Sequence, residues 1–252
     1  MKCLAIIANS LPYGDSSQIC QAFSPELGAF SLIAKGIRRK GCTLQKMCEY
    51  ELSLHPPKEE GLYLLKDAWL KRDYSSFGST ESWVAADCGM ELLGKLMIAV
   101  PEAPEYYKLL VDYLGYLGKV KRNSIFIFWR FFLRIFRFLG IPLETDFCDI
   151  CKTPQRIMAF DNSGGIYCKE CGTYAHFQAF SPLARELWQA LPTIARHLDD
   201  YQPDRTSLSQ INSLLLCYME SQHKKSFQLK SLKVLMQFYP EKEAQITKPV
   251  LQ

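Results

Sequence analysis

Two Cys-x-x-Cys pairs constrain the fold of this chain more than any other feature. Cys148 and Cys151 form the first pair, sixteen residues follow, and Cys168 and Cys171 form the second. This is the spacing of a four-thiolate ribbon, in which each pair turns tightly and directs two sulfurs at one metal ion. Between the pairs, Ile157–Phe160 and Ile166–Tyr167 have the character of short strands around a glycine-containing turn at residues 161–165. The pattern therefore predicts an inserted zinc ribbon at about residues 146–174.

Four sulfur ligands leave no coordination position for water, so the predicted zinc site is structural. Two disulfides or a redox-active pair are the alternatives. The apolar run at Met1–Ala8 is too short for a signal peptide, which argues against a secreted, disulfide-bonded protein. A redox Cys-x-x-Cys normally opens a helix after a strand, and two facing pairs do not fit that arrangement. We therefore favour zinc and expect a cytoplasmic protein.

Residues 1–72 have the two-residue period of β-strands. In the segment 44–54 the apolar residues alternate with Gln45, Glu49, Glu51 and Ser53, which predicts one buried and one solvated face. Four further strands are expected at Leu4–Ala8, Gln18–Phe23, Ala29–Ala34 and Leu62–Leu70. Five short strands in so short a segment favour a small closed β-barrel, because closure leaves no exposed edge.

From Ser79 onward the hydrophobic period becomes helical. Thr80 is expected to cap one helix, Pro104 suits the first turn of another, and Ser181-Pro182 has the pattern of a cap followed by a first helical residue. The sequence thus predicts an α+β protein with a barrel domain at 1–78 and a helical domain at 79–252 that carries the ribbon.

The segment 119–140 combines a long aromatic and aliphatic run with three arginines. Arg130, Arg134 and Arg137 interrupt it too often for a membrane span. Their spacing of i, i+4 and i+7 places them along one stripe of a helix. They form either the solvated edge of a core helix or the rim of a groove for an extended partner with acidic and aromatic residues.

A second basic cluster follows the third expected strand. Lys35, Arg38, Arg39 and Lys40 lie in a loop that contains Gly36 and Gly41, and Lys46 is expected on the next strand. The net charge of the chain is only +4, so nucleic-acid binding must depend on a local cluster such as this one. The loop either lays its charges along a phosphate backbone or is an ordinary solvated hairpin tip.

The sequence contains no phosphate-binding Gly-x-x-x-x-Gly-Lys-Ser/Thr loop, no Gly-x-Ser-x-Gly elbow and no His-Glu-x-x-His motif. Its four histidines are dispersed. We therefore do not expect an enzyme.

Several stretches, in order, resemble the RecO family of bacterial recombination mediators, and together they span most of the chain. They are Tyr13-Gly14-Asp15-Ser16-Ser17, Phe23–Gly28, Ile33–Arg39, Phe138–Pro142 leading into the cysteine pairs, and Leu229-Lys230-Ser231. The chain departs from the family at Lys152, where glycine is common, and at Asp15, where glutamate is usual. Neither position is an expected zinc ligand.

The resemblance implies an oligonucleotide/oligosaccharide-binding (OB) barrel that binds single- and double-stranded DNA and anneals complementary strands. It also implies contacts with the carboxyl-terminal tail of single-stranded DNA-binding protein and with RecR, and a role with them in promoting RecA loading. The expected location is the cytoplasm, at the nucleoid, and no membrane association is expected. Lys35, Arg38, Arg39 and Lys40 match the DNA-contacting loop of the family, and Arg130 matches its arginine for the tail. Arg134 and Arg137 are added only by helical geometry. The alternatives are a zinc-stabilised protein-interaction scaffold that does not bind DNA and an enzyme with an unrecognised site.

Overall fold

The fold is that of a computed structural model of the 252-residue chain, which describes residues 1–59, 61–96, 98–154, 156–173 and 176–241. The chain forms two compact units. The first contains residues 1–135 together with 229–231, and the second contains residues 136–228 and those from 232 onward. A short segment near the carboxyl terminus therefore belongs to the amino-terminal unit.

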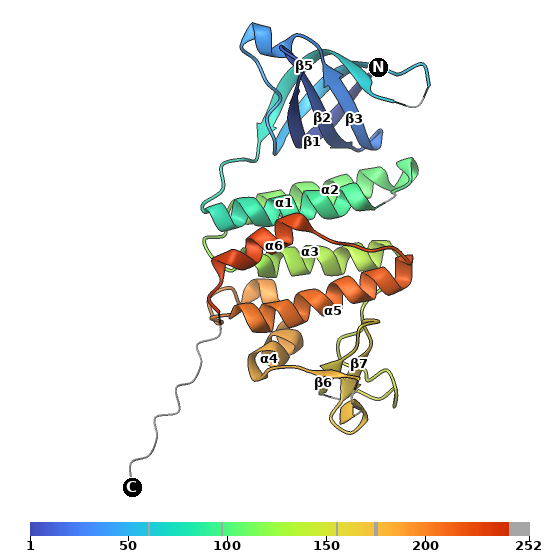
Figure 1. Ribbon diagram of the computed structural model, residues 1–252, viewed down its shortest axis with the longest axis vertical. Coiled ribbons are helices and arrows are strands. Elements are labelled where there is room, and N and C mark those ends of the chain that lie inside the picture. Colours follow the sequence, from blue (N-terminus) through green and yellow to red (C-terminus); the bar gives the residue numbers. More distant parts are fainter. Residues whose placement is uncertain (60, 97, 155, 174–175, 242–252) are drawn as a thin grey trace. The chain divides into compact units, whose positions relative to one another are not determined.

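A closed five-stranded barrel forms the amino-terminal part of the first unit (Figure 1). Its strands are β1 Lys2–Tyr13, β2 Ser17–Ser24, β3 Gly28–Ala34, β4 Cys48–His55 and β5 Tyr63–Asp73. Their order around the barrel is β1-β2-β3-β5-β4, and all pairs are antiparallel except the short β3–β5 contact that closes the barrel. This arrangement is OB-like. It confirms the predicted barrel.

Strand β4 corrects one detail of the sequence prediction and confirms another. The strand begins at Cys48 and not at Leu44, because Met47 has a left-handed φ of 62° that ends the preceding turn. The alternate residues Cys48, Tyr50, Leu52 and Leu54 point into the barrel core, as expected. Glu49, however, was expected on the solvated face and is only 8% exposed.

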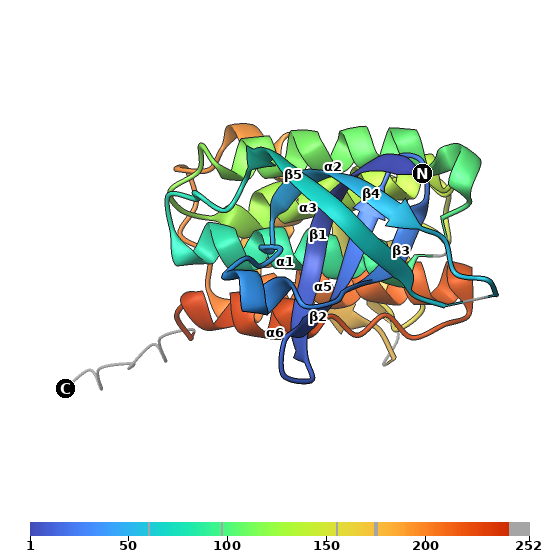
Figure 2. The same cartoon turned by 90° about the horizontal axis from the view of Figure 1, so that it is seen from above.

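Helices α1 (Thr80–Lys95) and α2 (Ala103–Leu117) pack against the barrel (Figures 1 and 2). On α2, Tyr107 stacks on Phe23 and donates a 2.6 Å hydrogen bond to Glu49, which explains why that carboxylate is buried. Ser79 caps α1 by accepting a hydrogen bond from the amide of Ser82, so the expected cap at Thr80 is wrong by one residue. Pro104 lies in the first turn of α2, as predicted.

Helix α3 (Ser124–Phe138) supplies much of the core. Its aromatic and aliphatic side chains are buried almost throughout, namely Ile125, Phe126, Ile127, Phe128, Trp129, Phe131, Phe132, Ile135 and Phe136. Burying so much apolar surface makes α3 a core helix rather than a membrane segment. Among the described residues, no helix is long and apolar enough to cross a membrane.

The second unit contains the ribbon and the remaining helices, apart from the first two residues of the last one. Strands β6 (Ile157–Phe160) and β7 (Ile166–Cys168) form the predicted hairpin, and a third strand, β8 (Gln178–Ala179), pairs with β6. Helix α4 (Pro182–Ala190) starts as expected, because the Ser181 hydroxyl caps it by accepting a hydrogen bond from the amide of Ala184. Helix α5 is Arg205–His223, and α6 is Lys230–Leu235.

One carboxylate of α1 fixes the start of α6 to the first unit. Glu91 accepts hydrogen bonds from the amides of Lys230 (3.0 Å) and Ser231 (2.9 Å) and from the Ser231 hydroxyl (2.6 Å). It thereby satisfies amides at the amino terminus of α6, where a negative charge is also favoured by the helix dipole. Burial alone raises the pKa of Glu91, but these hydrogen bonds outweigh it and hold the pKa below its usual value.

Replacing Glu91 tests this connection. We expect Glu91→Ala to destabilise the protein by about 1–2 kcal/mol at neutral pH, because it removes a cap with several charge-assisted hydrogen bonds. Since the folded-state pKa is depressed, the stabilisation is complete above the unfolded-state pKa and is lost as the pH falls through the folded one. Urea unfolding at about pH 7 and about pH 3 would measure this, with the exposed Glu59→Ala as control. A difference from wild type that does not change between the two pH values would contradict the assignment.

Candidate metal centre and nucleic-acid interface

The four ribbon cysteines converge on one point. The sulfurs of Cys148, Cys151, Cys168 and Cys171 all lie within 4.8 Å of one another. Zinc–sulfur bonds of about 2.3 Å in a tetrahedron place the sulfurs about 3.8 Å apart, which lies within this limit. The cluster can therefore hold a metal ion.

Local hydrogen bonds explain why the two pairs meet. The amide of Asp149 donates to the carbonyl of Ile166, and the amide of Ile166 donates to the Asp149 carboxylate, both at 2.8 Å. These bonds fasten the first pair to the strand that leads into the second. The turn between β6 and β7 is held by Asp161, whose carboxylate accepts hydrogen bonds from Ser163, Gly165 and Tyr167.

The first cysteine turn closes through the amide of Lys152, which donates to the carbonyl of Cys148 at 2.9 Å. Lys152 has a left-handed φ of 54°. Only glycine adopts this conformation without steric cost. The turn thus has the left-handed conformation although Lys152 stands where the sequence resemblance leads us to expect glycine.

The electrostatics of the cluster favour a cation. Burial alone raises the pKa of the Cys148 thiol. Backbone hydrogen bonds from Cys168, Cys151 and Ile150 have the larger, opposite effect and lower the pKa to about 6. Burial and the neighbouring sulfurs of Cys168 and Cys148 raise the pKa of Cys171 to about 12. One thiolate therefore forms readily, and its negative charge suppresses ionisation of the neighbouring thiols. The positive charge of a bound metal ion would allow several of these thiols to ionise together.

The basic loop, residues 35–41, lies beside the turn between β1 and β2. Gly36 and Gly41, with φ of 67° and 68°, flank a short 3₁₀ turn at Ile37–Lys40. The amide of Arg38 donates to the carbonyl of Ser16 (3.0 Å), and its guanidinium donates to the carbonyl of Gly14 (3.3 Å).

The side chains of Lys35, Arg38 and Arg39 are exposed, whereas that of Lys40 lies outside the described residues. The loop therefore presents its cations beside the β1–β2 turn, which is one of the loops with which OB barrels bind oligonucleotides.

Lys46 differs from the other four predicted DNA contacts. It lies in the turn before β4 and not on a strand. Its ammonium pairs with Asp87 at 2.7 Å and lies 5.1 Å from the centre of the Trp83 ring. Lys46 and Arg38 nevertheless line one groove of about 470 Å³, together with Trp83.

The arginine edge of α3, formed by Arg130, Arg134 and Arg137, is exposed or partly exposed. The guanidinium of Arg130 lies 5.4 Å from the centre of the Tyr116 ring, and that of Arg134 lies 3.9 Å from the Asp112 carboxylate. Arg137 lies in the last helical turn. Most apolar residues of α3 are buried, but Phe138 in its last turn is 40% exposed. The aromatic side chain in contact with Arg130 is Tyr116, which is 47% exposed.

Sequence patterns missed two aromatic residues at these sites. The patterns that indicate the basic clusters include neither Trp83 nor Tyr116. The buried positions of α2 include Tyr113, Leu114 and Leu117, and Tyr116 lies on the opposite, exposed face. A large aromatic residue at a position that the helical period assigns to solvent was the available signal.

Comparison with known proteins assigns the family. The model described as "Recombination protein O N terminal" matches residues 1–74, and "Recombination protein O C terminal" matches residues 80–233. The chain belongs to the RecO family. The RecO relatives include the "DNA repair protein RecO" of Exiguobacterium sibiricum, 26% identical over 67% of this chain and 69% of the relative. The protein of the same description from Desulfatibacillum aliphaticivorans is 27% identical over 67% of this chain and 70% of the relative.

The two RecO matches include the barrel, the helices up to the start of α6 and all four cysteines of the cluster. The expectation from the sequence resemblance is therefore confirmed at the level of the family and of the fold.

We expect the purified protein to contain one metal ion per chain, bound by the cysteine cluster. Cys148→Ser should abolish metal binding and destabilise the protein by at least about 2 kcal/mol, which corresponds to roughly 4–8 °C in melting temperature. Metal analysis and thermal melting with and without a chelator measure both effects. Cys42→Ser, at an exposed thiol outside the cluster, is the matched control. Metal-free protein whose melting temperature a chelator does not change would exclude a structural metal.

Proposed function

We propose that this protein is a recombination mediator that binds and anneals DNA without making or breaking covalent bonds. It acts with single-stranded DNA-binding protein and RecR to promote RecA loading, in the cytoplasm at the nucleoid. Membership of the RecO family supports this role. The observation that carries the DNA-binding part is the exposed basic loop, which Arg38 fastens to the β1–β2 turn of the OB-like barrel.

In this proposal residues 1–78 are the DNA-binding domain, and residues 79–252 form the helical domain with the ribbon at about 146–174. Lys35, Arg38, Arg39 and Lys40 contact phosphates, and each contact adds affinity by releasing counterions. Lys46 joins them only by exchanging its ion pair with Asp87 for one with a phosphate. The four cysteines hold one structural zinc ion, since a soft, closed set of four thiolates suits zinc and leaves no open position for catalysis.

The arginine edge of α3 is the proposed contact for the tail of single-stranded DNA-binding protein. Arg130 beside the exposed Tyr116 combines a positive charge with an aromatic surface. This pair suits a short segment with acidic and aromatic residues, which would approach from solvent. Arg134 shares its charge with Asp112, so we expect it and Arg137 to contribute less than Arg130.

The basic loop is tested by neutralising its two exposed cations that do not hold the β1–β2 turn. Lys35→Gln/Arg39→Gln should flatten the salt dependence of single-stranded DNA affinity by about 1.4 in log–log slope, because two phosphate contacts are lost at about 0.7 each. Fluorescence anisotropy with a labelled oligothymidylate at several salt concentrations measures the slope. Lys58→Gln/Lys66→Gln removes the same charge from exposed positions elsewhere on the barrel.

In this experiment, a wild-type protein that binds no DNA at physiological salt would instead favour a zinc-stabilised protein-interaction scaffold. A wild-type slope retained by Lys35→Gln/Arg39→Gln would place the DNA contacts elsewhere.

The arginine edge is tested by charge reversal. Arg130→Glu should abolish binding of a peptide with the tail sequence of single-stranded DNA-binding protein and leave the affinity for naked DNA within about twofold, since the two sites are separate. Tyr116→Ala should weaken peptide binding by about 0.5–2 kcal/mol, because it removes the exposed aromatic surface and the ring that positions the Arg130 guanidinium. Isothermal titration with the peptide gives these values, and Lys119→Glu, at an exposed neighbouring position, is the control. Equal losses of peptide and DNA binding would contradict two separate sites.

A further inference from the structure

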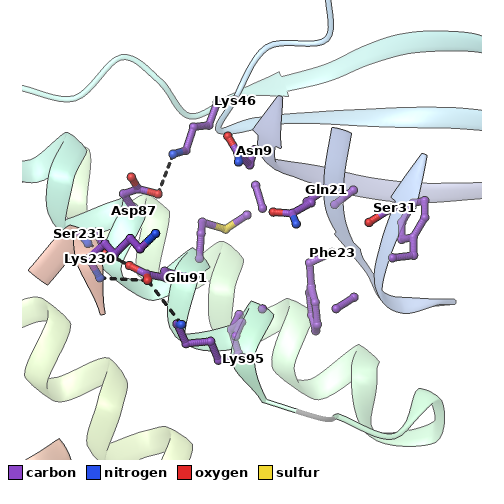
Figure 3. Close-up of a pocket in the computed structure, with 17 residues that line it drawn as sticks. Asn9, Gln21, Phe23, Ser31, Lys46, Asp87, Glu91, Lys95, Lys230 and Ser231 are labelled. Carbon is purple, nitrogen blue, oxygen red and sulfur yellow. Dashed lines mark hydrogen bonds and ion pairs between the residues drawn. The ribbon is translucent and has the colours of Figure 1, made fainter. Parts of the chain in front are cut away.

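A cleft of about 740 Å³ lies between the outer face of the barrel and α1, entirely within the first unit (Figure 3). On the barrel side its surface carries the neutral polar side chains of Asn9, Gln21 and Ser31. Across from them lie Met90 and Leu93 of α1. The strands of the barrel, which form the floor of the cleft, thus contribute only uncharged side chains, among them also Phe23 and Phe30, whereas the side of α1 carries both apolar and charged residues.

The floor offers hydrogen-bonding groups that the protein itself does not use. The amide of Gln21 and the hydroxyl of Ser31 make no hydrogen bond to another described residue, and Gln21 is exposed. Both belong to the β2–β3 face of the barrel. This is the face on which OB barrels bind oligonucleotides, and neutral amides and hydroxyls there can donate to and accept from base edges.

Three lysines follow one another along the helix side of the cleft, namely Lys46, Lys230 and Lys95 (Figure 3). The cleft also contains Asp87 and Glu91, but Asp87 is paired with Lys46, and Glu91 is occupied by the amino terminus of α6 and by Lys95 at 3.8 Å. The ammonium of Lys230 makes no ion pair among the described residues. The cleft thus has an excess of positive charge on one side of a neutral floor.

The cleft continues the groove beside the basic loop. Lys46 lines both cavities, and Arg38 lines the groove together with Lys46. Lys46 therefore connects the groove that Arg38 lines with the cleft that contains Lys230 and Lys95. A linear polyanion suits such an arrangement better than a compact anion, which would need the cations to converge on one point.

We propose that this cleft is the continuation of the DNA site and that it accepts a single strand. The strand runs from the basic loop past Lys46 into the cleft, with its phosphates at Lys230 and Lys95 and its bases over Asn9, Gln21 and Ser31. The bases of a duplex are already paired, so their edges are less available to these side chains than those of a single strand. The inference rests on the proposed DNA-binding function and adds the path and the strand preference.

The test neutralises the two lysines at the far end of the path. Lys95→Gln/Lys230→Gln is compared with Lys108→Gln/Lys233→Gln, which removes the same charge from exposed helical positions outside the cleft. Anisotropy is measured with oligothymidylates of increasing length and with a duplex of the longest length, at several salt concentrations. Melting temperatures show that each variant is folded.

We expect Lys95→Gln/Lys230→Gln to lower the single-strand salt slope by about 1.4 on long oligonucleotides and to leave duplex binding unchanged. On oligonucleotides too short to reach beyond the basic loop, this variant should have the affinity and salt slope of the wild type. The path is wrong if this variant matches its control on long strands while Lys35→Gln/Arg39→Gln still loses affinity, and in that case the proposed DNA function stands. Equal losses on single and double strands would exclude the strand preference, and a wild-type protein without DNA affinity would exclude both proposals.

Discussion

The arrangement of the first unit depends on one buried polar contact, the hydrogen bond from Tyr107 to Glu49. A carboxylate removed from water without a partner costs several kcal/mol, so a strand that carries Glu49 on its outer face requires a donor there. Burial and the neighbouring carboxylate raise the pKa of Tyr107 above its usual value, which keeps the phenol protonated and able to donate. With Tyr107 stacked on Phe23, α2 covers this side of the barrel. The part of the β2–β3 face beside α1 stays open and becomes the floor of the cleft.

The ribbon is organised in a different way, because its structure is almost entirely local. The hydrogen bonds that bring the cysteine pairs together join residues between Asp149 and Tyr167. Its contact with α5 depends on Gly164, whose φ is 84° and where a Cβ would overlap the backbone of Tyr218. Glycine at this position therefore serves both the turn and the close approach of the helix.

The features that the sequence predicted well are those determined by neighbouring residues. The cysteine spacing, the alternation from Cys48 to Leu54 and the cap at Ser181 each depend on a few consecutive positions. The burial of Glu49, the pairing of Lys46 with Asp87 and the capping of α6 by Glu91 could not be predicted, because each partner lies 41 or more residues away. The same limit applies to the candidate sites: the loop at residues 35–41 was visible as a cluster of charges, whereas the cleft is assembled from six separate stretches of the sequence.

The contact between Glu91 and residues 230 and 231 also orders events in time. The first unit contains residues 1–135 but is complete only with residues 229–231, so residues 136–228 must be synthesised before it can close. At about 5–20 residues per second, this interval is roughly 5–20 s, much longer than most small domains need to fold. During this interval the barrel and α1 are already synthesised, but the carboxylate of Glu91 does not yet have the amides of residues 230 and 231 as hydrogen-bond donors. The amino-terminal unit is therefore completed last, when residues 229–231 bind to it.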